Sequence, residues 1–286
     1  MSDTEDTRSQ NANTMRIAVG LVLVMALAGG GAWWFLHRST AVVTPPAAEA
    51  DPQPSAAEPA KPAEPPPVQH PLAESPAAAE PLPPVAESDG VLADALTALI
   101  GAPAVQAWLV PDEVARRFVA TVDNLPRNVP LEKRRPLRAP PETPVVDRTV
   151  VDASAGTERI TLSARNAARY DAAVALFARA DARALADSYR RFYPLLQQAY
   201  QDLGYPDRYF NDRVVEAIDD MLRAPEPTGP VILVQPRVLY EYEDAALEKL
   251  SSGQKLLLRM GQAHARTVKA KLREVRALIA TAPKQP

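Results

Sequence analysis

The apolar run from Ile17 to Leu36 limits the folding of this chain more than any other feature. It is twenty residues long, carries no charged or strongly polar side chain, and has two tryptophans at its C-terminal end. A helix of this length extends about 30 Å, which matches the hydrocarbon thickness of a bilayer, and tryptophan favours the membrane interface. We therefore expect a single transmembrane helix over residues 17–36, preceded by a tail of residues 1–16.

A cleaved signal peptide is the alternative interpretation of this run. Ser39-Thr40-Ala41 resembles a small-residue cleavage site. However, the run is longer than the ~7–15 apolar residues of a signal peptide, and the start of the chain is acidic. An anchor is therefore favoured. Arg8 and Arg16 precede it and only Arg38 lies close behind it, which favours a cytoplasmic N-terminus and an exported body.

Residues 39–88 form a tract in which no hydrophobic periodicity is visible. The tract holds fourteen prolines, thirteen alanines and six glutamates, and its net charge is −6 (seven acids against Lys61). Proline blocks helices and removes backbone donors, so such a tract cannot build a core. We expect a disordered acidic linker that favours extended polyproline II and reaches at most ~155 Å.

The rest of the chain has the composition of a folded domain. Residues 89–286 carry 28 bases and 25 acids, so this part is mildly basic (+3) although the whole chain has a net charge of −3. There is no cysteine, which excludes disulfides, zinc–thiolate sites, iron–sulfur clusters and cysteine nucleophiles. The body must therefore be stabilised by its own hydrophobic core, and we place it at residues 89–282.

Hydrophobic patterns in the body predict a mainly α-helical domain with a small antiparallel β-sheet, an α+β fold. The helices are expected over residues 91–100, 111–123, 164–178, 182–203, 212–222 and about 251–280. The strands are expected over residues 145–152, 158–162, 231–234 and 238–242, the first two as a hairpin. Asp89 is expected to cap the first helix. A capping box, Ser251 to Gln254, begins the last helical region, and Gly261 is expected to break it.

Four stretches of the body carry a distinctive set of residues. They are residues 117–127 (RFVATVDNLPR), 193–200 (YPLLQQAY), 203–206 with 210–213 (LGYP and FNDR) and 255–261 (KLLLRMG). In this order they resemble one family of bacterial membrane-anchored proteins, domain of unknown function three-zero-one-four, over about residues 90–280. The resemblance implies a body in the bacterial envelope behind an anchor in the inner (plasma) membrane. It implies no activity.

No catalytic motif emerges from the sequence. The body contains a single histidine, His264, and the chain lacks a GxSxG elbow, a P-loop, a dinucleotide-binding glycine fingerprint and an HExxH motif. Glu216, Asp219 and Asp220 are close in sequence, but glycoside hydrolysis needs two carboxyl groups across a cleft, and neighbouring residues point in different directions. We therefore expect no enzyme, no cofactor and no metal site, and we interpret His264 as an exposed helix residue.

The C-terminal helical region carries the clearest candidate for a binding surface. This basic face, for an anionic ligand or a partner, consists of Lys255, Arg259, Arg266, Lys269, Arg273 and Arg276. The last four recur at helical spacing beside an apolar stripe, Val268, Leu272, Val275 and Ile279. Such a face suits lipid phosphates, cell-wall carboxylates or an acidic protein. The alternatives are a solvated face, or neutralisation by the helix that carries Asp219 and Asp220.

Seven of the thirteen phenylalanine and tyrosine residues lie between residues 189 and 210. Tyr205, Tyr209 and Phe210 form a candidate contact loop for a glycan or a peptide. The competing interpretation assigns the helical aromatics to the core, because residues 185, 189, 192, 196 and 200 share one helical face. The loop residues would then fix the turn.

The layout favours a non-enzymatic scaffold or adaptor, in which an anchor and a spacer position a helical binding domain in the cell envelope. The alternatives are a hydrolase of envelope polymers with carboxylates assembled by the fold, and an energy-coupling adaptor with the layout of the TonB and TolA proteins. The expected partners are the membrane and a cell-wall component, a lipid or another envelope protein. No nucleic-acid partner is expected, because aromatics are not interleaved with the bases. The sequence identifies no small-molecule substrate.

Overall fold

The computed structural model describes residues 67–72, 81–131, 135–140, 144–152, 154 and 156–280. The expected tail, the expected transmembrane helix and most of the expected linker lie outside these residues. Within the described ranges, no helix combines the length and the apolar character that crossing a bilayer requires.

Helices dominate the described chain, with a small sheet beside them. The helices are α3 (Asp89–Ile100), α4 (Ala102–Trp108), α5 (Val114–Asn124), α6 (Asp171–Arg179), α7 (Ala182–Asp202), α8 (Phe210–Leu222), α9 (Ala245–Glu248), α10 (Ser252–Met260) and α11 (Gln262–Ile279). The strands are β1 (Val146–Asp152), β2 (Thr157–Leu162), β3 (Ile232–Val234) and β4 (Glu241–Tyr242), and the 3-10 segments are η3 (Val85–Glu87) and η5 (Ala164–Tyr170). The expected α+β class is confirmed for this part of the chain.

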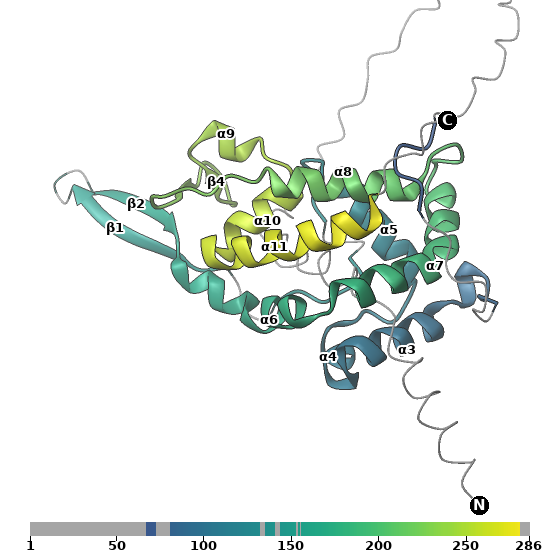
Figure 1. Ribbon diagram of the computed structural model, residues 1–286. Coiled ribbons are helices and arrows are strands. Elements are labelled where there is room, and N and C mark those ends of the chain that lie inside the picture. The colour runs from purple at the N-terminus through teal and green to yellow at the C-terminus, as the bar shows by residue number, and fades with distance from the viewer. Residues whose placement is uncertain are drawn as a thin grey trace, which may run out of the picture.

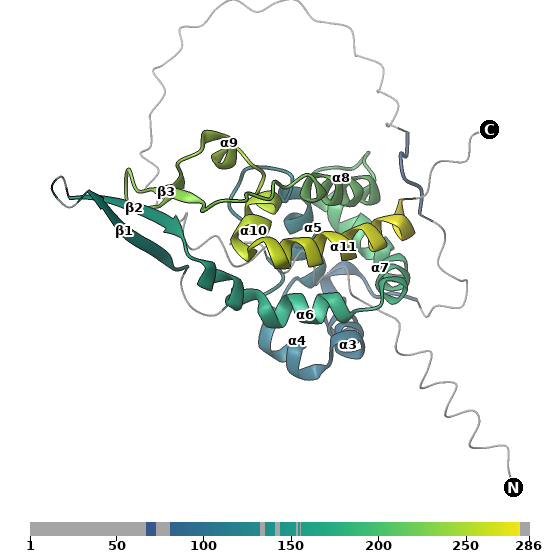
Figure 2. The ribbon, with the colours of Figure 1, turned by 60° about the vertical axis from the view of Figure 1, so that its left-hand side comes forward.

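The helices enclose one large hydrophobic core with α11 near its centre. α11 packs against α6, α7, α8 and α10, while α5 packs against α7 and α8 (Figures 1 and 2). The predicted apolar stripe of α11 is confirmed, since each member is at most 1% exposed: Val268, Leu272, Val275 and Ile279. A stripe at helical spacing buries one face of a helix and leaves the other to polar side chains. The basic residues of α11 therefore lie around the edge of this buried stripe.

The expected face of the long helix α7 is also confirmed. The residues at helical spacing are all buried: Leu185, Tyr189, Phe192, Leu196 and Tyr200. The helix begins after Asp181, whose side chain accepts a hydrogen bond from the Ala184 N–H. Gly204 follows the helix with φ = 114°, which glycine adopts without strain, so the chain leaves the helix where the sequence predicts.

Asp89 caps a different helix from the one expected. It is the first residue of α3, and its carboxylate accepts hydrogen bonds from the N–H groups of Glu113 (2.9 Å) and Val114 (2.8 Å), where α5 begins. The prediction that Asp89 caps residues 91–100 is therefore wrong. The carboxylate satisfies donors that the start of α5 leaves free, and the contact joins α3 to α5.

The helical segments differ from the prediction in three further places. The two short helices α4 and α9 were not predicted. The helix expected over residues 164–178 is instead divided into η5 and α6 at Tyr170, whose side chain is fully buried. A short helix has too few periodic positions to stand out from its neighbours in the sequence.

Ser251 caps α10, and Gly261 separates α10 from α11. The Ser251 hydroxyl accepts a hydrogen bond from the Gln254 N–H at 3.1 Å, as the capping box predicts. The Gln254 side chain does not return to Ser251, because it donates to the carbonyl and the carboxylate of Asp220. The predicted break is confirmed, since Gly261 has φ = 78°.

The four strands pair antiparallel in the order β1-β2-β3-β4, so β1 and β4 are the edges of the sheet. β1 and β2 form the predicted hairpin, which projects from the helical body (Figure 1). Leu233, Tyr242 and Leu258 form a second, small apolar cluster. This cluster attaches the inner end of the sheet to α10.

Part of the expected linker packs against the body. Leu72, Leu82 and Val85 are partly buried against the large core, and η3 contacts α7. Residues before the expected boundary at residue 89 therefore contact the body. These apolar side chains find partners that only the folded domain provides, so the composition of the tract does not reveal the contact.

Candidate functional site

The basic face expected on the C-terminal helices is largely engaged in ion pairs. Arg266 and Lys269 both bind Glu226, at 2.8 and 2.9 Å. Arg276 makes two hydrogen bonds to the Asp219 carboxylate, at 2.5 and 2.8 Å. Both acids lie outside α11, so other parts of the fold compensate these three cations.

Lys255 is withdrawn from the surface. Its side chain is 4% exposed, and its Nζ donates to Glu248 at 2.7 Å and to Asn128 at 3.2 Å. Burial lowers the pKa of Lys255, and the hydrogen bond to Glu248 opposes that shift. Lys255 therefore fastens α9 and the loop after α5 to α10, and it is not available to a ligand.

Arg259 and Arg273 complete the basic face, and no ion pair is found for either within the described ranges. Arg273 is exposed on α11. Arg259 is partly buried and lies near Tyr242. Burial raises the pKa of Tyr242, and the nearby Arg259 opposes this rise. Arg259 thus lies between the sheet and the helices.

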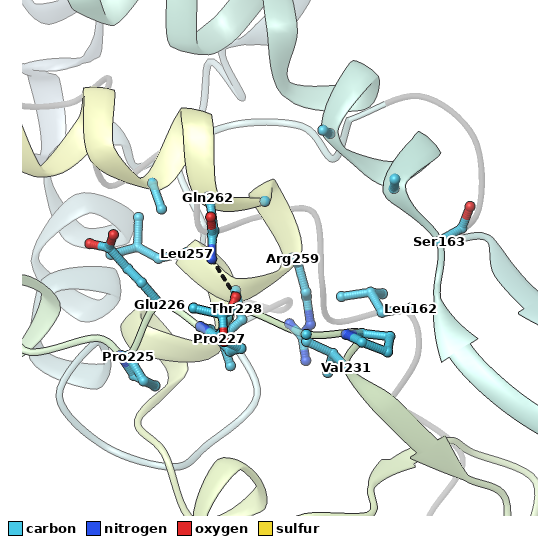
Figure 3. Close-up of a pocket in the computed structure, with 17 residues that line it drawn as sticks. Leu162, Ser163, Pro225, Glu226, Pro227, Thr228, Val231, Leu257, Arg259 and Gln262 are labelled. Carbon is cyan, nitrogen blue, oxygen red and sulfur yellow. Dashed lines mark hydrogen bonds between the residues drawn. The ribbon is translucent and has the colours of Figure 1, made fainter.

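A cavity of about 310 Å³ lies beside Arg259, where the α10–α11 junction faces the sheet (Figure 3). Its walls come from the end of β2, η5, the loop of residues 225–231, the end of α10 and the start of α11. Leucine, proline and alanine side chains form most of the wall. The charged and amide side chains that line it are Glu226, Arg259 and Gln262. The cavity therefore combines an apolar wall with a few polar groups.

Side chains of α11 hold the loop of residues 225–231 in place. Gln262 Nε2 donates a hydrogen bond to the Pro227 carbonyl (Figure 3). Glu226 lies between Arg266 and Lys269, and their hydrogen bonds lower its pKa to about 2. Glu226 is therefore ionised at neutral pH and serves as a fixed anion. A general acid needs a raised pKa, so this carboxylate does not suit that role.

Neither Glu226 nor its loop is among the site residues predicted from the sequence. The available signal was the cluster Pro225-Glu226-Pro227-Thr228-Gly229-Pro230, because proline and glycine at this density mark a loop between regular elements. Glu226 is the one acid in that cluster. Its pairing with two cations of α11 depends on residues about 40 positions away.

The aromatic contact loop is divided between surface and core. Phe210 is fully buried and packs against Phe118 and Tyr200, with ring centroids 6.0 and 5.4 Å apart. It belongs to the core, because α8 begins at this residue. Tyr205 is partly buried and stacks on Tyr200 at 4.6 Å. Tyr209 is 37% exposed, so it alone of the three presents a large surface to a ligand.

Two of the four stretches that carry the family resemblance, residues 117–127 and residues 203–206 with 210–213, meet at Asp123. This residue is 4% exposed, and its carboxylate accepts hydrogen bonds from Arg127 and Arg213, both at 3.0 Å. The Tyr205 hydroxyl donates to the other carboxylate oxygen at 3.3 Å. The contacts join α5, the loop before α8 and α8 itself. These residues of the family resemblance therefore bind one another inside the fold and do not form an open site.

A family model described as "Protein of unknown function (DUF3014)" matches residues 114–276, more than half of the chain. The chain belongs to this family. The match confirms the resemblance found in the sequence. It runs from the start of α5 into the last turn of α11, so every residue that lines the cavity lies within the DUF3014 region. No curated protein and no solved structure matches the chain.

Proposed function

We propose that this DUF3014 protein is a non-enzymatic scaffold or adaptor of the bacterial cell envelope that binds an anionic group of its partner at Arg259. Residues 17–36 anchor it in the inner membrane in a single pass, with the N-terminus in the cytoplasm. The proline-rich tract carries the body into the periplasm. The partner is a cell-wall component, a lipid or another envelope protein.

The observation that carries this proposal is the position of Arg259. It is the one cation among the described residues that line the cavity. A guanidinium beside an apolar wall binds carboxylate or phosphate oxygens through its fork of donors, and partial burial strengthens the contact. Two cations, Arg266 and Lys269, share the single carboxylate of Glu226. The net charge of this group is therefore positive, which also favours an anion in the cavity.

The size and chemistry of the cavity support binding over hydrolysis. A volume of about 310 Å³ is at the lower end of the ~300–1,000 Å³ of small-molecule sites. The cavity therefore suits one inserted side chain or headgroup of a larger partner. Glu226 is the one carboxylate among the described lining residues, and it is already paired, whereas carboxylate-based hydrolysis uses two.

The test is photocrosslinking in cells that make the full chain. A photoreactive phenylalanine replaces Thr228, which is exposed and lines the cavity. We expect one adduct of defined mass, and we expect Arg259→Gln in the same chain to reduce it about tenfold, the cost of about one charge-assisted contact. Mass spectrometry of the adduct then distinguishes a carboxylate-bearing partner from a phospholipid.

Arg273→Gln is the matched control for this experiment. Arg273 is exposed on α11 and does not line the cavity, so its removal changes the net charge equally and should leave the adduct intact. An adduct that survives Arg259→Gln contradicts the proposed role of Arg259. Complete absence of an adduct at Thr228 contradicts the proposed binding at this cavity.

The proposed topology has an independent test. Alkaline phosphatase fused after Pro286 folds actively only outside the cytoplasm, so we expect active enzyme. The same fusion in a chain lacking residues 17–36 is the control and should be inactive. An inactive full-length fusion, present at normal abundance, would overturn the proposed orientation.

A further inference from the structure

Residues 67–72 cross the first turn of α8, although they belong to the proline-rich tract. In both views this dark blue segment lies at the end of the body where α8 begins and α11 ends (Figures 1 and 2). It is neither helix nor strand, and the chain bends at Gln69 and His70. The segment lies before the DUF3014 match, while the α8 residues that hold it lie within the match.

Two adjacent residues of α8 hold the main chain of this segment. The Asp212 carboxylate accepts the Gln69 N–H on one oxygen (3.1 Å) and the His70 N–H on the other (2.7 Å). Asn211 Nδ2 donates to the His70 carbonyl at 2.7 Å. Two successive N–H groups that point the same way form a concave site for an anion. The carboxylate therefore recognises a backbone shape and not a particular side chain.

The Asn211 side chain is held in place independently of this segment. It is 1% exposed, and its Nδ2 also donates to the Ile279 carbonyl at the end of α11. That bond satisfies a carbonyl that the end of a helix leaves free. The amide is therefore already oriented when a peptide arrives, which lowers the entropic cost of binding.

We propose that Asn211 and Asp212 form a peptide-binding site, and that residues 67–72 occupy it as a detachable ligand from the same chain. The ligand class is a short proline-flanked peptide whose bend presents two successive N–H groups followed by a carbonyl. Pro67 and Pro71 flank the two donors and restrict the chain on either side of the bend. Leu72 adds an apolar contact with the core.

The segment is held by a limited set of contacts. The three hydrogen bonds to α8, a further interaction of Pro71 and the partly buried Leu72 act against the conformational entropy of ordering six residues, and these contributions are similar in size. Two buried polar atoms in the contact, His70 Nδ1 and Asn211 Oδ1, lack a hydrogen-bond partner among the described residues. Release lets both reach water, which further favours detachment.

Release also lengthens the tether, a consequence that rests on the proposed membrane anchor. Release of residues 67–72 adds up to ~19 Å of polyproline II reach from these six residues alone. A partner peptide of the same class that displaces residues 67–72 therefore lets the body move farther from the bilayer. The binding experiment below does not depend on the anchor, so it can fail while the proposed function stands.

The test uses the full chain in detergent and a fluorescent peptide with the sequence of residues 67–72. His70→Pro removes one of the two N–H donors from the tethered segment and frees the site. We expect the peptide to bind this variant about tenfold more tightly than the parent chain, in which the tethered segment competes. Gln69→Pro, which removes the other donor, should act in the same way.

Matched controls separate this site from adventitious binding. Val68→Pro introduces proline next to the two donors but leaves both N–H groups, so its peptide affinity should equal that of the parent. A peptide that carries the His70→Pro change should not bind. Asp212→Ala in the His70→Pro chain should abolish binding while the far-UV circular dichroism is retained. Equal peptide binding by the parent and His70→Pro chains, or no binding by either, overturns the proposal.

A distance measurement covers the case in which Asp212→Ala disturbs the fold. The chain has no cysteine, so Pro67→Cys and Asp207→Cys, both at exposed positions, carry spin labels without background. We expect a narrow distance distribution in the parent and in Val68→Pro, and a broader, longer one in His70→Pro. Identical distributions in all three chains overturn the proposal, because the Asp212 contact would then not hold the segment.

Discussion

Arg213 donates its Nε–H to Asp123 Oδ1 at 3.0 Å, and this pair joins the first turns of α8 to the end of α5. The Asp123 side chain is 5% exposed and that of Arg213 is 13% exposed. The Arg213 guanidinium also donates to the Asp123 main-chain carbonyl. Arginine can match two acceptors at once because its donors form a planar fork. The pair therefore fixes the angle between two helices as well as their separation.

Removal of this carboxylate should destabilise the body strongly. We expect Asp123→Ala to lower the free energy of unfolding by about 3–5 kcal/mol, because the largely buried Arg213 loses its buried carboxylate and keeps only the exposed Glu216 as an anion. Urea denaturation followed by circular dichroism measures the loss. Asp147→Ala is the control, since it breaks an exposed pair with Arg165 and should cost less than about 1 kcal/mol. Similar losses in the two variants would contradict the structural role of Asp123.

Gly253, in the first turn of α10, has no room for a side chain. A Cβ there would lie 2.8 Å from Met221 Cγ and 3.3 Å from the Leu125 carbonyl oxygen. The Gly253 N–H donates to that same carbonyl at 2.9 Å, so the backbone cannot move away without losing a hydrogen bond. We expect Gly253→Ala to cost about 1–3 kcal/mol through overpacking, measured as a lower midpoint of thermal unfolding.

Gly90 provides the opposite case for the same substitution. It lies in the first turn of α3, and a Cβ added there meets nothing within 4 Å. Alanine favours a helix over glycine by up to ~1 kcal/mol, so Gly90→Ala should leave the unfolding midpoint unchanged or raise it. If Gly90→Ala were the more damaging of the two, the close approach of α10 to the loop after α5 would be refuted.

Glu226 should contribute to the stability of the body in acid. Its pKa is lowered from about 4.5 to about 2 by the hydrogen bonds of Arg266 and Lys269. A lowered pKa means that the folded state favours the ionised form, so the contribution is present above pH ~4.5 and is lost as the pH falls towards about 2. We therefore expect protonation of Glu226 to lower the free energy of unfolding of the parent as the pH falls from about 4.5 to about 2.

The variant Glu226→Gln tests this contribution. It should be less stable than the parent at pH 7, and the difference between the two should shrink as the pH falls from about 4.5 to about 2. Urea midpoints measured at several pH values report the difference. Glu87→Gln, at an exposed turn, is the control and should follow the parent throughout. A constant difference between Glu226→Gln and the parent would show that the ion pairs are not linked to folding.

Local patterns were sufficient for the faces of the long helices and for the hairpin. The spacing of apolar residues identified the buried faces of α7 and α11, and Gly261 identified the break before α11. These predictions depend on periodicity and on the backbone freedom of glycine, which are properties of consecutive residues. The β1–β2 hairpin was found in the same way, from β-branched runs on either side of a turn.

The candidate site could be predicted only in part. Arg259 belonged to the expected basic face, yet nothing in the sequence distinguished it from Lys255, which is buried and paired with Glu248. The cavity also needs the loop that carries Glu226, and that loop approaches α11 only in the folded domain. Which cation stays unpaired is decided by the acids that packing brings near, and sequence spacing does not contain that information.

The sequence by itself determined the helical faces, the hairpin, the break at Gly261 and the absence of any cysteine chemistry, because each follows from residue type and short-range spacing. Tertiary structure alone decided the partners of the polar groups. Asp89 caps α5 instead of its own helix, and Asp212 holds a segment of the proline-rich tract. Carboxylates bind whichever donors the packed core places within about 3 Å, and those donors come from distant parts of the chain.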